Sequence, residues 1–81
     1  MENIHQIIEE INSSNPKLKK SLILNQVQVA ELLGVSQSTL ENWRRVGLGP
    51  RYKKVENGKR ARVLYPKIEV ARFILDTVQT A

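Results

Sequence analysis

The sequence contains no cysteine and only one histidine, His5. Without cysteine there is no disulfide framework and no zinc site built on thiolate ligands. No run of apolar residues approaches the roughly 18 that a membrane-spanning helix needs. The first ten residues include three glutamates and therefore differ from the basic start and apolar run of a secretory signal peptide. With 81 residues, the chain is predicted to form a single small domain in the cytoplasm, with no membrane partner.

Features of catalysis and cofactor binding are equally scarce. The serines have no histidine base at a plausible position, and His5 has no nearby carboxylate pair with which to hold a metal ion. The four glycines form no phosphate-binding loop. We therefore expect no catalytic residues, no metal and no cofactor, and a protein that is not an enzyme.

Positive charge is concentrated in one third of the chain. The net charge is +5, but residues 41–67 alone contain nine lysines and arginines against two glutamates. The rest of the chain is slightly acidic. A local positive field of this kind attracts phosphate backbones through counterion release, so it favours a nucleic-acid partner over a face that serves only solubility.

An amphipathic helix is predicted near the N-terminus. Isoleucines at positions 4, 7, 8 and 11 follow the i, i+3, i+4, i+7 spacing of one helix face. Ser13 to Pro16 then breaks the pattern, and Lys17 to Ser21 reads as a linker or short turn. The isoleucine face is either a dimer seam or a surface packed on the core. We favour core packing, because an isolated helix of this length makes a weak seam.

Two short helices follow, separated by Gly34, Val35 and Ser36. The first has Asn25 as its predicted N-cap, with Gln28 completing a capping box. Gly34 ends it, and Ser36 is the favoured N-cap of the second helix, ahead of Ser38. The two apolar stripes consist of Val29, Leu32 and Leu33 in the first helix, and of Leu40, Trp43, Val46 and weakly Thr39 in the second. A turn of this length sets two helices at a steep angle, so that the second can enter a major groove.

A basic hairpin and a final helix complete the order. Asn57-Gly58 is a strong signal for a two-residue hairpin turn, and pairing across it opposes Val55 to Arg60 and Tyr52 to Val63. The predicted faces are not cleanly apolar, so the pattern supports the hairpin more firmly than its register. Pro66 suits the first turn of the last helix, whose apolar stripe consists of Ala71, Ile74, Leu75 and Val78.

These motifs resemble a known family. Residues 27–36, together with Thr39, Leu40 and Trp43, fill the buried positions of the helix-turn-helix pattern. The longer stretch from Leu24 to Ile74 is similar to the winged helix-turn-helix of phage excisionases, prophage activators and MerR-type DNA-binding domains. The resemblance implies a mainly α fold with a small β-hairpin, in which residues 1–21 form an added helix and linker and residues 22–81 form the DNA-binding domain.

The resemblance also implies which residues contact double-stranded DNA. Helix 37–46 would read the major groove, and wing 51–65 would contact the backbone or the minor groove. Gln37 and Asn42 can each bond an adenine edge in two places, and Arg45 can bond guanine. The expected contacts in the helix and its cap are Ser36, Gln37, Ser38, Thr39, Glu41, Asn42, Arg44 and Arg45. Those in the wing are Lys53, Lys54, Lys59, Arg60 and Arg62.

Two of these expectations leave alternatives open. Glu41 repels phosphate, so it either accepts from cytosine N4 or pairs with Arg44 or Arg45, and we favour the pairing. The biological role is also open. The favoured hypothesis is a nucleoid-associated transcription regulator. The alternatives within DNA binding are an excisionase that directs recombination and a terminase small-subunit domain that recognises DNA for packaging. Each fits a homodimer or a cooperative array on DNA, while a protein-interaction module without DNA activity is the alternative from another class.

Overall fold

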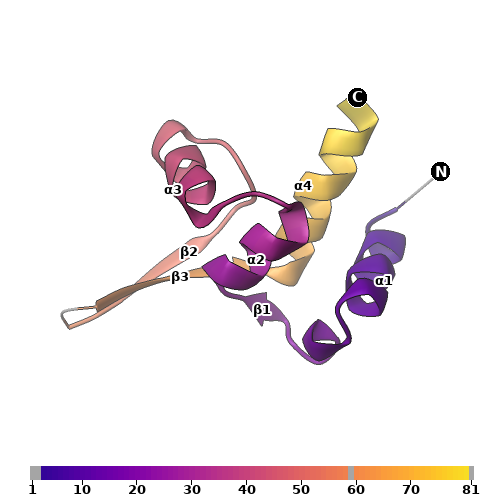
Figure 1. Cartoon of the computed structure of the whole chain (residues 1–81), viewed down its shortest axis with the longest axis horizontal. Helices are drawn as coiled ribbons and strands as arrows, with labels where there is room; N and C mark the ends of the chain where they lie inside the picture. The colour runs from indigo at the N-terminus through magenta and orange to yellow at the C-terminus, as the bar shows by residue number, and fades with distance from the viewer. Residues whose placement is uncertain (1–2, 59, 81) are drawn as a thin grey trace.

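The computed structural model describes residues 3–58 and 60–80 of the chain, and Figure 1 shows how the elements are arranged. The helices and strands are α1 (Ile4–Ser14), the 3-10 turn η1 (Pro16–Leu18), β1 (Ile23–Leu24), α2 (Gln26–Leu33), α3 (Gln37–Val46), β2 (Lys53–Asn57), β3 (Arg60–Pro66) and α4 (Lys67–Thr80). The predicted mainly helical fold with a small β-hairpin is therefore confirmed.

Local capping signals place the helix ends. The Asn25 side chain accepts from the Gln28 backbone N–H, and the Gln28 side chain accepts from the Asn25 N–H, which completes the predicted capping box. Gly34 has φ +70°, which is a left-handed conformation. Glycine adopts it at little energetic cost because it has no Cβ. The Val35 N–H then donates to the Ala30 carbonyl at 3.0 Å and closes the end of α2. The Ser36 hydroxyl accepts from the Thr39 N–H, so Ser36 is the N-cap of α3.

The three strands form an antiparallel sheet in the order β1-β3-β2. The two-residue strand β1, which the sequence did not predict, pairs Ile23 with Pro66 and Leu24 with Tyr65. The backbone N–H of Lys67 also donates to the carbonyl of Leu22 at 2.8 Å. These contacts make Pro66 the last residue of β3 and not, as predicted, the first turn of a helix. Since proline lacks an N–H, the end of a strand suits it.

The hairpin exists, but its predicted register is wrong by two residues. Asn57 pairs with Arg60, Val55 with Arg62 and Lys54 with Val63. Gly58, with φ +67°, is therefore the first residue of the loop and not the second. The favoured two-residue hairpin turns require a positive φ at that first position, which glycine adopts at little cost. A shift of two leaves every side chain on its predicted face of the sheet and changes only its cross-strand neighbour.

Every helix and the strands β1 and β3 contribute to one hydrophobic core. Its buried members are Ile7, Ile11, Leu18, Leu24, Val29, Ala30, Leu40, Tyr65, Val70 and Ala71. The isoleucines of α1 lie in this core, and α1 runs beside α4 at one end of the molecule, so the predicted core packing of α1 is confirmed (Figure 1). Ile74 and Leu75 also pack against the core, whereas the side chain of Val78 lies outside the described residues.

The second half of α3 departs from the predicted apolar stripe. Leu40 is fully buried and Trp43 packs against the core, with its ring 5.8 Å from that of Phe73. Val46, predicted to be buried, is 59% exposed. It is the last residue of α3, where the chain turns away at Gly47 and the core no longer covers it.

Candidate nucleic-acid interface

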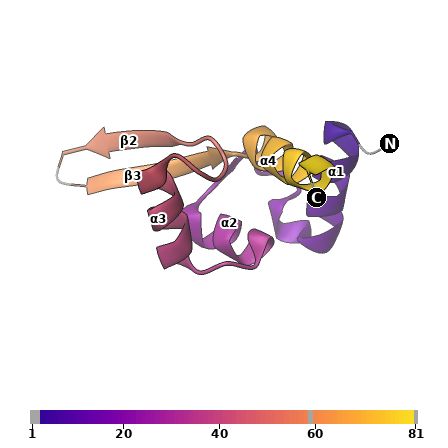
Figure 2. The same ribbon diagram turned by 90° about the horizontal axis from the view of Figure 1, so that it is seen from above.

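The hairpin β2–β3 projects from the end of the molecule opposite α1, and α3 lies near the base of the hairpin (Figure 1 and Figure 2). The hairpin extends well beyond the helical body, in the manner of a wing. The molecule is accordingly elongated, with principal extents of 43 × 28 × 18 Å. The basic side chains of α3 and of the described part of the hairpin are Arg44, Arg45, Lys53, Lys54 and Arg62.

One face of α3 is exposed and polar. The fold exposes Ser38, Glu41, Asn42 and Arg45 at the i, i+3, i+4, i+7 spacing, and Gln37 at the first helical position is exposed as well. Leu40 and Trp43 anchor the opposite face, so α3 has a defined rotation relative to the body. The exposed face therefore presents amide, hydroxyl, carboxylate and guanidinium groups that can hydrogen-bond to base edges.

The start of α3 is organised around its cap. The Ser36 and Thr39 hydroxyls lie 2.9 Å apart, and the Ser36 Oγ also accepts from the Thr39 N–H. Thr39 is half-buried and Ser36 is exposed. Helix N-termini favour anions through free N–H groups and the helix dipole, so this turn is suited to contact a phosphate.

Arg44 differs from the other predicted contacts, because it connects α3 to the wing. Its Nη1 donates to the Tyr65 hydroxyl at 2.8 Å, and its guanidinium carbon lies 5.7 Å from the centroid of the Tyr52 ring. The two tyrosine rings are themselves 6.0 Å apart. Arg44 thus holds the base of the wing against α3, and this contact leaves its side chain half-buried.

Glu41 does not form the expected pair with an arginine of its own helix. Among the described residues its hydrogen-bond donor is Gln26, whose Nε2 lies 3.3 Å from the Glu41 Oε1. Gln26 is the first residue of α2, so the partner comes from the neighbouring helix. The favoured prediction of a pair within α3 was wrong. Spacing within a helix cannot predict a partner that the fold brings close from another helix.

The wing residues divide between the two faces of the hairpin. Lys53 and Arg62 lie on one face with Val55, and Lys54 lies on the other. Lys54 Nζ is 3.7 Å from Glu56 Oε1, an exposed ion pair that offsets part of its charge. Lys59 lies outside the described residues, as does the side chain of Arg60. Lys53, Lys54 and Arg62 are all exposed.

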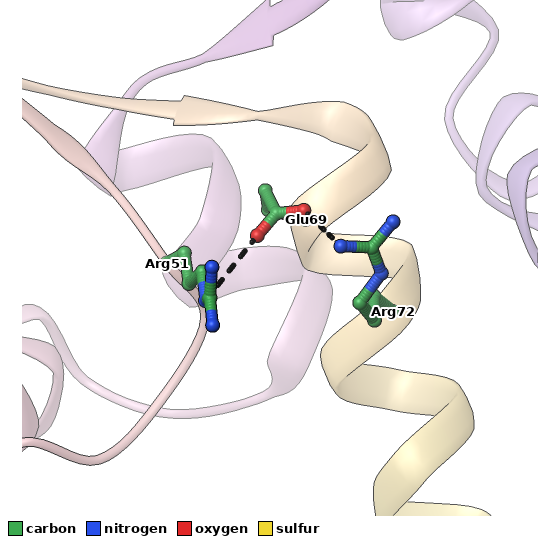
Figure 3. A network of polar contacts seen from close by, with 3 residues as sticks. All are labelled: Arg51, Glu69 and Arg72. Carbon is green, nitrogen blue, oxygen red and sulfur yellow. Dashed lines mark hydrogen bonds and ion pairs between the residues drawn. The ribbon is translucent and has the colours of Figure 1, made fainter.

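A second basic cluster, which the sequence did not predict, joins the wing to α4. Glu69 lies between two arginines, 2.9 Å from Arg72 Nη1 and 3.9 Å from Arg51 Nε, as Figure 3 shows. The Glu69 side chain is only 16% exposed, whereas that of Arg51 is 88% exposed. The i, i+3 spacing of Glu69 and Arg72 is a local signal from which their pair can be predicted, but no local pattern indicates that Arg51 joins it.

Neither a metal-binding cluster nor a membrane-spanning helix is found in the described part of the chain. Within residues 3–58 and 60–80 no three histidine, aspartate or glutamate side chains gather to hold a metal ion. No helix in these ranges has the length and apolar character needed to cross a bilayer.

Comparison with known proteins agrees with this geometry. A family model described as a helix-turn-helix domain matches residues 23–77, which include α2, α3, the wing and most of α4. The family occurs in excisionase-like DNA-binding proteins. No curated protein matches the chain.

Proposed function

Because this chain belongs to the helix-turn-helix domain family, as a winged DNA-binding member, we propose that it regulates transcription by binding a specific double-stranded DNA site. In this proposal α3 reads base edges in the major groove and the wing contacts the backbone or minor groove. The protein would then be located with the nucleoid. The observation that supports the proposal best is the exposed polar face of α3. The helix lies near the base of the projecting hairpin (Figure 2), in which Lys53, Lys54 and Arg62 are exposed.

The proposed contacts have different tasks. Gln37, Asn42 and Arg45 are the proposed base readers, since their amide and guanidinium groups match the patterns of the major groove. Ser36, Ser38 and Thr39 at the start of α3, together with Lys53, Lys54 and Arg62, are proposed to hold phosphates. Arg44 is proposed to act mainly through Tyr65 and Tyr52, by positioning the wing.

The first experiment is selection of bound fragments from a random duplex library at about 150 mM salt. One enriched motif, bound at least roughly a thousandfold more tightly than scrambled DNA, would support sequence-specific binding. Repeats within the motif would show whether two or more copies bind together. No enrichment, with weak binding that disappears as salt rises, would contradict the proposal and favour a protein-interaction module.

The position of the sites in a genome then tests the regulatory role. Sites that overlap promoters would support it. Sites at recombination attachment sequences or at packaging sequences would replace it with an excisionase or terminase role, since these roles share the same fold.

A pair of variants separates base reading from phosphate contact. Arg45→Ala is expected to weaken cognate binding by roughly 1–3 kcal/mol and to relax the preference at one base pair. Arg62→Ala on the wing is expected to weaken binding to cognate and scrambled DNA alike and to reduce the salt dependence. Titration of both variants on both duplexes measures this difference, and equal behaviour of the two variants would contradict the assignment of base reading to α3.

A further inference from the structure

Gln26 connects the two helices of the helix-turn-helix through its side-chain amide. The half-buried residue lies at the first position of α2 and faces the first turn of α3. Its Nε2 donates to Gln37 Oε1 at 3.1 Å and to Glu41 Oε1 at 3.3 Å. Gln37 and Glu41 are exposed and lie four residues apart on α3, so one amide engages two side chains at the proposed DNA interface.

The chemistry of Glu41 fixes the orientation of this amide. An ionised carboxylate only accepts hydrogen bonds, so Gln26 must turn its NH₂ group, and not its carbonyl, toward Glu41. The NH₂ group has two hydrogens, and the second one points to Gln37. Gln37 accepts this hydrogen bond with its carbonyl oxygen. Its NH₂ group cannot take that place, because two donors would then face each other. The carboxylate of Glu41 therefore sets the orientation of the Gln26 amide, and the Gln26 amide sets the orientation of the Gln37 amide.

We propose that Gln26 is a specificity-determining residue, which fixes Gln37 as a hydrogen-bond donor toward a guanine in the major groove. The inference rests on the proposed function. With its Oε1 turned to Gln26, Gln37 presents its NH₂ group to DNA. Guanine offers two acceptors there, N7 and O6, whereas adenine combines the acceptor N7 with an N6 donor. The expected two-point contact with adenine would need the second lone pair of Gln37 Oε1 to face the groove while the first stays with Gln26. A preference of the wild type for adenine at this base pair would therefore contradict the inference.

Reversal of the network provides the sharpest test. In the exchange variant Gln26→Glu with Glu41→Gln, the carboxylate lies on α2 and only accepts. Both glutamines of α3 then donate to it, and Gln37 turns its carbonyl toward the groove. The exchange preserves side-chain shape and net charge, and neither position is fully buried, so the fold is expected to persist. Circular dichroism and thermal melting check that it does.

Selection and titration are performed on the wild-type protein and the exchange variant. At the base pair that Gln37→Ala identifies, the wild type is expected to prefer guanine over adenine by about tenfold. The exchange variant is expected to lose this preference or to favour a base with an amino donor, adenine or cytosine, while preferences that depend on Arg45 persist. A guanine preference that survives the exchange, or an equal loss at every motif position, would overturn the inference.

A modified base checks the contact itself. Replacement of that guanine by 7-deazaguanine removes the N7 acceptor, so it is expected to weaken binding by the wild type but not by Gln37→Ala. Asn42→Ala is the matched control, because it removes an amide from the same face without disturbing Gln26. Its own affinity is expected to fall, but its binding is expected to stay sensitive to 7-deazaguanine. Insensitivity of the wild type to 7-deazaguanine would overturn the contact with N7, and loss of the guanine preference as well would overturn the guanine assignment.

The results distinguish this inference from the proposed function. If the wild type selects no motif, the proposed function fails, and the inference fails with it. If the wild type selects a motif and the exchange leaves it unchanged, only the role of Gln26 is overturned.

Discussion

Single side chains with distant partners determine much of how this small domain is held together. Lys67 is an example, because it is only 5% exposed although lysine is rarely buried. Its Nζ donates to Asn12 Oδ1 at 2.8 Å and to the Leu18 carbonyl, so it connects α4 to α1 and η1. The first residue of α4 thus ties the N-terminal segment to the rest of the fold.

Lys67→Met is expected to lower the free energy of unfolding by about 1–3 kcal/mol, because Asn12 and the Leu18 carbonyl lose their donor. Denaturant unfolding measures the change, with Lys17→Met as the control at an exposed lysine. No loss relative to this control would mean that the buried contacts of Lys67 contribute nothing to stability.

The same residue predicts a dependence on pH. Burial lowers the pKa of Lys67 below its usual value of 10.5. Between the folded and unfolded pKa values the unfolded chain binds more protons, so stability contributed through Lys67 rises as the pH increases through that window. The difference in unfolding free energy between the wild type and Lys67→Met is therefore expected to grow toward pH 10.5. A constant difference would contradict the lowered pKa.

At the scale of elements, α3 depends on a cap at its start and on a contact with the wing near its end. The cap is Ser36, and the contact is the hydrogen bond from Arg44 to Tyr65 with the ring of Tyr52 beside it. Since both features lie next to the exposed polar face, they position the proposed base readers without touching a base.

Ser36→Ala is expected to destabilise the protein by about 1 kcal/mol, because the Thr39 N–H loses its acceptor. Ser38→Ala is the matched control, since the alternative N-cap lies within α3 and its removal should change stability by less than about 0.5 kcal/mol. Thermal or denaturant unfolding of both variants gives the comparison. Equal effects would contradict the assignment of the cap.

Tyr65→Phe preserves the buried ring and removes the acceptor of Arg44. The expected loss of stability is about 1 kcal/mol, and binding to all DNA sequences should weaken because the wing is less firmly oriented. The control is Tyr52→Phe, which keeps the ring that faces Arg44. Unfolding and DNA titration measure both effects, and a change confined to one base pair would show that Arg44 reads a base instead.

For the whole molecule, the N-terminal helix completes a core that is small in a chain of 81 residues. Small domains bury a low fraction of their surface, so every buried side chain represents a large part of the total stability. Ile7 and Ile11 are 2% and 3% exposed and belong to the same cluster as Leu40 of α3. The helices α3 and α1 therefore share one core.

Ile7→Ala is expected to lower the free energy of unfolding by about 2–5 kcal/mol, which is a large part of what a domain of this size has. DNA affinity should fall with it once the folded fraction decreases. His5→Ala, at an exposed position of the same helix, is the control. A variant that stays as stable as the wild type would show that α1 packs only loosely on the body.

The sequence by itself determined the features whose causes lie within a few residues. The caps at Asn25 and Ser36, the helix end at Gly34 and the exposed polar face of α3 follow from local hydrogen bonds, backbone freedom and helical periodicity. The basic wing was predicted for the same reason, because turn residues and charge are local signals.

Only the tertiary structure decided which distant groups meet. Four features depend on contacts between residues far apart in the chain. They are the hydrogen bond of Gln26 with Glu41, that of Arg44 with Tyr65, the buried contacts of Lys67, and the pairing of β1 with β3. The register of the hairpin was also decided there, because Gly58 is the first residue of the loop and not the second. Such contacts arise when the core brings elements together, and no periodicity along the chain encodes them.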